Sequence, residues 1–254
     1  MTDEQAGEGS VWSSQEQIAA YLRDRIINGD FEPGEKLPSL RQLEAQFTVA
    51  ANTVRAAIAT LTRERLVVSE QGRGVIVRHH RQLTMRPAAY KTPARQGEKY
   101  QWLTENEKRG MAAKAKLLHV GDVVPPAAVR EVFQLGKGEP ALLRRQVLTL
   151  DGEPCELVEV YLPLEIARGT KLMNNHLLRG GSGRVLEDLG YPSLRCEDRV
   201  SAQLPTPEQY AALQMPTKLP VLRTFRTTYS TDDRPIQAEI MAKAGHMYEL
   251  QYDF

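Results

Sequence analysis

The chain has 254 residues and a formal net charge of +1, with 33 basic and 32 acidic side chains. This length suits two domains of ordinary size, and the balanced charge argues against indiscriminate nucleic-acid binding by the whole chain. No apolar run is long enough to span a bilayer, and the cysteines, Cys155 and Cys196, fit no metal-ligand or disulfide pattern. We therefore expect a cytoplasmic protein without membrane attachment, structural metal or cofactor.

The N-terminal part begins with a tail and a first helix. Residues 1–12 lack hydrophobic periodicity, and we expect a disordered tail there. Ser13 and Glu16 have the spacing of a capping box, and Asn28 with Gly29 is typical of a helix end. The apolar stripe of this helix consists of Ile18, Leu22 and Ile26.

The next stretch shows two helices at the spacing of a helix-turn-helix. Ser39 and Gln42 form a second capping box and open a short helix. After a tight turn, apolar residues at three- and four-residue spacing predict a longer helix over about 50–64. In a helix-turn-helix, this second helix enters the major groove of DNA by its N-terminal end.

Two β-branched runs follow the second helix. They cover residues 66–68 and 75–77 and bracket a Gln-Gly-Arg-Gly sequence. Glycine permits the positive φ that a hairpin tip requires, so we expect a short β-hairpin, or wing. The sequence therefore predicts a winged helix-turn-helix domain over residues 13–78.

The candidate DNA contacts are exposed polar residues at the helix starts and at the wing tip. Arg55 could fork onto a guanine edge or a phosphate, whereas Arg41 is better placed for the DNA backbone. The alternatives are a solvated surface charge for each arginine and a plain hairpin turn for the tip. The full set is Lys36, Ser39, Arg41, Ala51, Asn52, Thr53, Arg55, Gln71, Gly72 and Arg73.

The second half of the chain is richer in strands. Residues 79–100 lose periodicity and are predicted to be a linker, and residues 101–254 form the second domain. Asp151 and Gly152 are a strong hairpin turn signal. Strands are predicted over 128–135, 141–150, 155–162, 221–230, 235–244 and 248–254, with helices over 183–189 and 206–213. This pattern predicts an α+β domain built on an antiparallel sheet.

Three stretches resemble the DNA-binding domain of GntR-type bacterial transcription regulators: PGEKLPSLRQLEAQF, NTVRAAIATL and QGRGVIV. Ala50 and Ala51 stand where that family usually has a Ser-Arg pair, Leu40 replaces a usual Glu before Arg41, and Arg65 replaces a usual Gly. The second half is similar to the UTRA effector domain of the HutC subfamily, through LLRRQVLTLDGEPCELVEVYLP, PTPEQYAALQMP and TDDRPIQAEIM.

The resemblance implies a chorismate-lyase-like fold that binds a small metabolite, often acidic or phosphorylated, in a pocket walled by the sheet. Arg145 matches the first of two family arginines, and Val147 stands at the second. Ser182 and Arg184 match a family helix N-terminus suited to an anion. The candidate effector-binding residues are Arg145, Glu159, Ser182, Arg184 and Glu239. For each, a solvent-facing side chain is the alternative, because strand residues alternate between faces.

Together these features predict a sequence-specific DNA-binding transcription regulator, in its simplest form a repressor that a small-molecule effector controls. The resemblance implies a homodimer on two-fold related operator DNA. One alternative is a constitutive repressor whose second domain serves only dimerisation. The other is a lyase-like enzyme, but the sequence offers no matched acid-base pair or nucleophile, so we expect no enzymatic activity.

Overall fold

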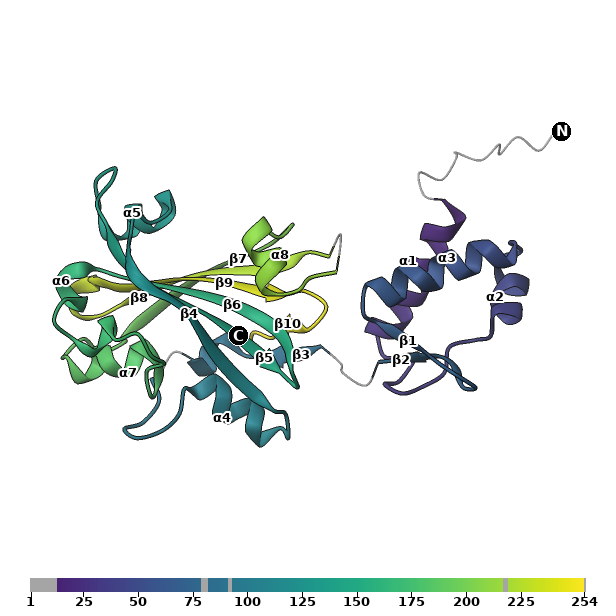
Figure 1. Ribbon diagram of the computed structural model, residues 1–254, viewed down its shortest axis with the longest axis horizontal. Helices are drawn as coiled ribbons and strands as arrows, with labels where there is room; N and C mark the ends of the chain where they lie inside the picture. Colours follow the sequence, from purple (N-terminus) through teal and green to yellow (C-terminus); the bar gives the residue numbers. More distant parts are fainter. Residues whose placement is uncertain (1–12, 79–81, 91–92, 217–218, 254) are drawn as a thin grey trace. The chain divides into compact units, whose positions relative to one another are not determined.

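The structure, a computed structural model, describes residues 13–78, 82–90, 93–216 and 219–253. The predicted disordered tail over 1–12 lies outside the described residues. The chain divides into two compact units, Met1–Gln82 and Leu83–Phe254, and each is described by itself (Figure 1). Within the described ranges, no helix combines the length and hydrophobicity needed to cross a membrane.

The first unit contains three helices and a hairpin. They are α1 (Ser14–Ile27), α2 (Leu40–Phe47), α3 (Ala51–Arg63), β1 (Val67–Glu70) and β2 (Gly74–Val77). Both predicted capping boxes are present, at Ser13 and at Ser39. Apolar side chains from all three helices and from the hairpin form one buried core. The predicted winged helix-turn-helix is therefore confirmed.

The second unit is built on a six-stranded antiparallel sheet with the strand order β4-β5-β6-β9-β8-β7. Its strands are β4 (Ala113–Val123), β5 (Ala141–Leu150), β6 (Glu153–Leu162), β7 (Arg195–Gln203), β8 (Val221–Tyr229) and β9 (Pro235–Ala244). Two short strands, β3 (Leu83–Met85) and β10 (Tyr248–Leu250), pair in parallel beside it. The predicted α+β class with an antiparallel sheet is confirmed.

Helices cover both faces of this sheet (Figure 1). α4 (Gln101–Lys108) and α7 (Gly181–Asp188) lie on one face, which we call the inner face. α5 (Ala127–Phe133) and α8 (Pro207–Ala212) lie on the other, the outer face. The remaining helical elements are α6 (Leu164–Ala167), η1 (Pro87–Tyr90), η2 (Lys171–Met173) and η3 (Thr231–Asp233). The largest apolar core lies on the inner face, and two smaller cores lie on the outer face.

Three predicted elements differ from the structure. The strand predicted over 128–135 is helix α5, because Val129, Val132 and Phe133 have helical spacing and bury one side. Strands β3, β4 and β7 were not predicted. The linker predicted over 79–100 is shorter: residues 79–81 and 91–92 lie outside the described residues, but β3 and η1 belong to the second unit. The final strand ends at Leu250 rather than at the C-terminus.

Candidate DNA interface and candidate ligand pocket

The N-terminal end of α3 is an open helix terminus. Its N-cap, Ala50, has the extended backbone of a cap residue, with φ −70° and ψ 150°, but no side chain that can bond the first turn. The amides of Thr53 and Val54 donate to the Ala50 carbonyl, whereas the first amides of a helix have no intrahelical acceptor. These amides and the helix dipole favour an anion at this end.

Two exposed polar side chains flank that terminus. Arg55 lies one turn into α3, and its Nη1 donates to Asn52 Oδ1 at 2.9 Å. The bond orients the guanidinium beside the Asn52 amide, so both groups face the same region of solvent. Ala51 and Thr53, in the same first turn, are half-buried. The arrangement offers hydrogen-bond donors of the kind that read guanine or bind phosphate.

The two candidate DNA contacts at the start of α2, Arg41 and Ser39, are in different situations. Arg41 is exposed in the first turn. Ser39 caps the helix: its Oγ donates to Gln42 Oε1 at 2.8 Å and accepts from the Gln42 amide at 3.4 Å. The Ser39 hydroxyl is therefore engaged in the predicted capping box, and its additional contact with DNA stays a prediction.

The wing tip is exposed. Gly72 has φ +80° with open space around it, and Gln71 and Arg73 flank it. Arg73 Nη1 forms an ion pair with Glu70 at 2.6 Å, a surface contact that contributes little to stability. The Lys36 side chain lies against Gly74, where an added Cβ would come within 2.9 Å of Lys36 Cε. Lys36 and the tip thus form one basic edge of the first unit.

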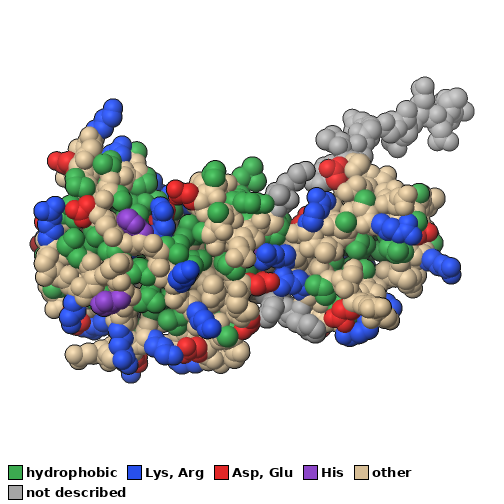
Figure 2. Space-filling view, in the orientation of Figure 1, with side chains coloured by type: hydrophobic (Ala, Val, Ile, Leu, Met, Phe, Trp, Pro, Cys, Tyr) green, Lys and Arg blue, Asp and Glu red, His purple; other side chains and the backbone are tan. Residues whose placement is uncertain are grey.

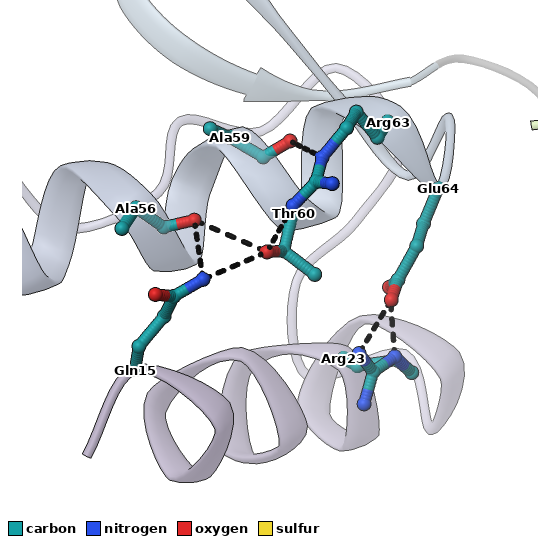
Figure 3. A network of polar contacts seen from close by, with 7 residues as sticks. All are labelled: Gln15, Arg23, Ala56, Ala59, Thr60, Arg63 and Glu64. Atoms are coloured by element: carbon teal, nitrogen blue, oxygen red, sulfur yellow. Dashed lines mark hydrogen bonds and ion pairs between the residues drawn. The ribbon is translucent and has the colours of Figure 1, made fainter. Parts of the chain in front are cut away.

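Polar contacts brace α3 against α1, and Figure 3 shows them. Arg23 donates to both carboxylate oxygens of Glu64, from Nε at 2.8 Å and from Nη2 at 2.6 Å. At the other end, Gln15 Nε2 donates to Thr60 Oγ1 at 3.3 Å. These contacts lie about two turns apart on α1 but only about one turn apart on α3, so they hold the C-terminal part of α3 against α1. Sequence reasoning missed them, because partners so distant in the chain leave no local pattern.

The second unit contains a cavity of about 100 Å³ on the inner face of the sheet. Its lining comes mostly from residues of 85–90 and 93–102, from the first turn of α7 and from strands β6 to β9. A neighbouring hollow of about 220 Å³ extends toward β5. The two share Tyr100, Gly181, Ser182 and Glu239 in their walls, and we call them together the pocket.

Charged side chains cross the pocket floor in one row. Strand register places Arg144, Val160, Glu239, Arg226 and Asp198 side by side on β5, β6, β9, β8 and β7. Because facing residues of neighbouring strands share a face, all five lie on the inner face. The row therefore brings two cations and two anions to the ligand side of the sheet.

Most of these charges are already paired or hydrogen-bonded. Arg226 Nε and Nη2 each donate to an Asp198 carboxylate oxygen at 2.7 Å, a bidentate ion pair. Arg144 donates from Nη1 and Nη2 to backbone carbonyls of residues 172, 174 and 176, which fixes that loop to the sheet. A second floor pair joins Lys243 Nζ to Glu156 Oε1 at 3.0 Å. Burial raises the pKa of the Glu239 carboxyl above its ordinary value.

The structure brings only two of the five effector-site candidates to the pocket. Ser182 lies at the first turn of α7, where its Oγ donates to Gln237 Oε1 at 2.7 Å, and Glu239 lies on the floor. Arg184 instead pairs with Asp188 and Glu187 along α7.

Arg145 and Glu159 lie on the outer face, so their assignment to the pocket is corrected. Their side chains pair with each other at 2.6 Å, and Glu208 of α8 lies 3.5 Å from Arg145. The reason is a register error of one residue, which moves a strand side chain to the opposite face. Arg144 and Gln146 are the β5 residues that line the pocket.

Several pocket residues were missed by sequence reasoning. They are Arg144, Glu156, Asp198, Arg226 and Lys243. A usable signal existed in β9, where Gln237, Glu239 and Lys243 recur at even spacing while the residues between them are apolar. Such alternation indicates a polar inner surface on a strand that is buried on both sides.

Comparisons with known proteins agree with this arrangement. A family model described as bacterial regulatory proteins, gntR family, matches residues 14–77, and the UTRA domain model matches residues 108–249. An HTH-type transcriptional regulator of Streptomyces coelicolor is 27% identical over 94% of this chain and 91% of its own length. The HTH-type transcriptional repressor NagR of Bacillus subtilis is 26% identical over 84% of this chain and 83% of its own length.

Among solved structures, the crystal structure of PhnF from Mycobacterium smegmatis has a similar fold. It aligns with a TM-score of 0.56 and 24% identity, over 93% of this chain and 98% of that chain. The alignment spans both the helix-turn-helix unit and the sheet unit.

Proposed function

The chain belongs to the GntR family of bacterial regulatory proteins that carry a UTRA domain, and from this premise we propose that it is a repressor controlled by a small molecule. It is a DNA-binding transcription regulator with an effector-binding domain, and it is not an enzyme. The observation that carries the proposal is the pocket, a hollow with a charged floor in the second unit. We propose that the protein acts in the cytoplasm.

For the DNA-binding half, we propose that α3 enters the major groove by its open N-terminal end. Asn52 and Arg55 would read base edges, while Arg41 and the unpaired first amides of α3 would bind phosphates. Lys36, Gln71, Gly72 and Arg73 would follow the adjacent backbone or minor groove from the wing. Two copies of the chain would bind two related half-sites as a homodimer.

For the effector half, we propose that the ligand occupies the pocket over Glu239 and beside Ser182. Both residues border the two hollows, so a ligand in either one contacts them. An effector changes DNA affinity only to the extent that it binds the DNA-competent and incompetent states differently. Release of the operator by the ligand is the direction expected of an inducible repressor.

The first experiment maps DNA bound by the purified full chain. Genomic fragments of the source organism are selected at fixed salt and sequenced, and the enriched site is then footprinted. Arg55→Ala should lower affinity for that site by about 10- to 100-fold. Arg63→Ala is the matched control, because Arg63 lies at the opposite end of α3 and bonds Ala59 and Thr60 of its own helix.

The second stage adds a metabolite library to the same footprint. Release by one compound supports the inducible repressor. A specific footprint that no compound changes would instead favour a constitutive repressor whose second unit serves only dimerisation. Absence of any enriched site would overturn sequence-specific binding itself.

A further inference from the structure

One carboxylate of the pocket floor has no ion-pair partner among the described residues, and the third floor cation, Arg144, is held by backbone carbonyls. Arg226 is held by Asp198 through two bonds of 2.7 Å, and Lys243 is held by Glu156 at 3.0 Å. Glu239 lies between these pairs, and no cation of the described residues forms an ion pair with it. The floor of the inner cavity thus presents one carboxylate more than its paired cations neutralise.

Glu239 borders both hollows, and the larger of them lies on its β6 side. On the β8 side, its cross-strand neighbour Arg226 is turned to Asp198 and also donates to the Pro87 carbonyl at 3.3 Å. On the β6 side, its neighbour is Val160, a small apolar residue that lines the larger hollow. Arg144 stands one strand further, about 10 Å from Glu239 between backbones. A ligand group can therefore reach Glu239 over Val160.

We propose that the pocket binds a small molecule with a cationic nitrogen, an ammonium or guanidinium group, that pairs with Glu239. This inference rests on the proposed effector function and defines the chemical class of the effector. The nitrogen would complete the missing charge pair, while Gln146 and Ser182 offer polar contacts around it. Any anionic group on the same molecule would lie toward Arg144. An amino-acid-like zwitterion therefore matches the charges of Glu239 and Arg144. An isolated phosphate beside Glu239 would be repelled by its carboxylate.

The pH dependence of ligand binding gives a second, independent test of this proposal. Burial raises the pKa of Glu239, and the nearby Arg226 opposes that rise. Lys243 and a hydrogen bond from Gln237 also lower this pKa, and Asp198 raises it. Glu156, Tyr100 and Arg144 are further titratable or charged groups of the pocket lining. A cationic ligand binds the deprotonated carboxylate, so its affinity falls as the pH is lowered through the raised pKa, and below that pH binding releases a proton.

The test uses the full chain and a library of primary metabolites, grouped into amine- or guanidine-bearing compounds and size-matched compounds that lack such a nitrogen. Thermal shift identifies binders, and a ligand present at about 100 times its Kd should raise Tm by about 5–10 °C. Calorimetry then compares each binder with its deaminated counterpart on wild type, Glu239→Gln and Glu208→Gln. Glu208 is the control because its side chain is exposed on the outer face.

The expected result is that binders carry a cationic nitrogen and that Glu239→Gln lowers their affinity by about 10- to 100-fold, while Glu208→Gln leaves it unchanged. The Gln variant should keep ligand-free operator binding, which shows that it is folded. Binders without a cationic nitrogen that bind wild type and Glu239→Gln equally would overturn the ligand class and leave the effector function intact. No binder of either group would overturn both.

Discussion

The buried ion pair between Lys243 and Glu156 gives the sharpest test of how the pocket floor is stabilised. The charged atoms are 3.0 Å apart, and the side chains are only 2% and 3% exposed. At an effective dielectric constant near 20, their attraction is about 5 kcal/mol. Lys243→Met leaves the Glu156 carboxylate buried without its partner, so we expect the free energy of unfolding to fall by about 3–5 kcal/mol.

Urea unfolding of the second unit measures this loss. Trp102 is buried in the largest core, and Trp12→Phe in all variants leaves it as the single tryptophan reporter. The matched control is Lys116→Met on the exposed side of β4, which should change stability by less than about 0.5 kcal/mol. Lys243→Met combined with Glu156→Leu should regain most of the stability, because neither charge is then buried alone. A single-variant loss no larger than that of Lys116→Met would refute the reasoning.

Three further outcomes are expected. Ala50→Ser should stabilise the first unit by about 1 kcal/mol in urea unfolding, because Ala50 already has the backbone conformation of an N-cap and lacks only the hydroxyl. An unchanged urea midpoint of unfolding would argue against an uncapped α3. The raised pKa of Glu239 means that the folded state favours its protonated form. Its contribution to stability is therefore present below the unfolded pKa and is lost as the pH rises through the folded pKa. Glu239→Gln should remove this loss when unfolding of the ligand-free protein is measured across pH. Burial raises the pKa of the Cys155 thiol to about 12, so a thiol reagent at neutral pH should modify the half-buried Cys196 in the native protein and reach Cys155 only after denaturation.

The first unit could be predicted from the sequence because its signals are local. Each capping box joins residues three positions apart, and both Ser13 and Ser39 cap as expected. The wing depends on glycines within one short loop, and Gly72 and Gly74 have the positive φ that the turn requires. Contacts such as Arg23 with Glu64 join distant parts of the chain, so they could not be predicted in the same way.

The pocket depends on non-local information, and this is where the prediction failed. Arg144 and Arg145 are adjacent, and the sequence alone does not say which of them faces α7 and which faces α8. In the structure, Arg144 is opposite Val160 and Arg145 is opposite Glu159, and this strand register determines which arginine lies on each face of the sheet. A single step in register therefore separates a pocket residue from an outer-face ion pair.

In the proposed function, the start of the second unit is where ligand binding would act on the connection to the first unit. β3 begins at Leu83, directly after the first unit, and pairs with β10, while Met85 and Pro87 line the pocket. Arg226 holds the Pro87 carbonyl with the same Nη2 that binds Asp198. A cation paired with Glu239 would change the field around this guanidinium, so the proposed ligand would act on the contact that holds Pro87 to the sheet of the second unit. The proposed effector would change DNA affinity only to the extent that it binds the DNA-competent and incompetent states with different affinities.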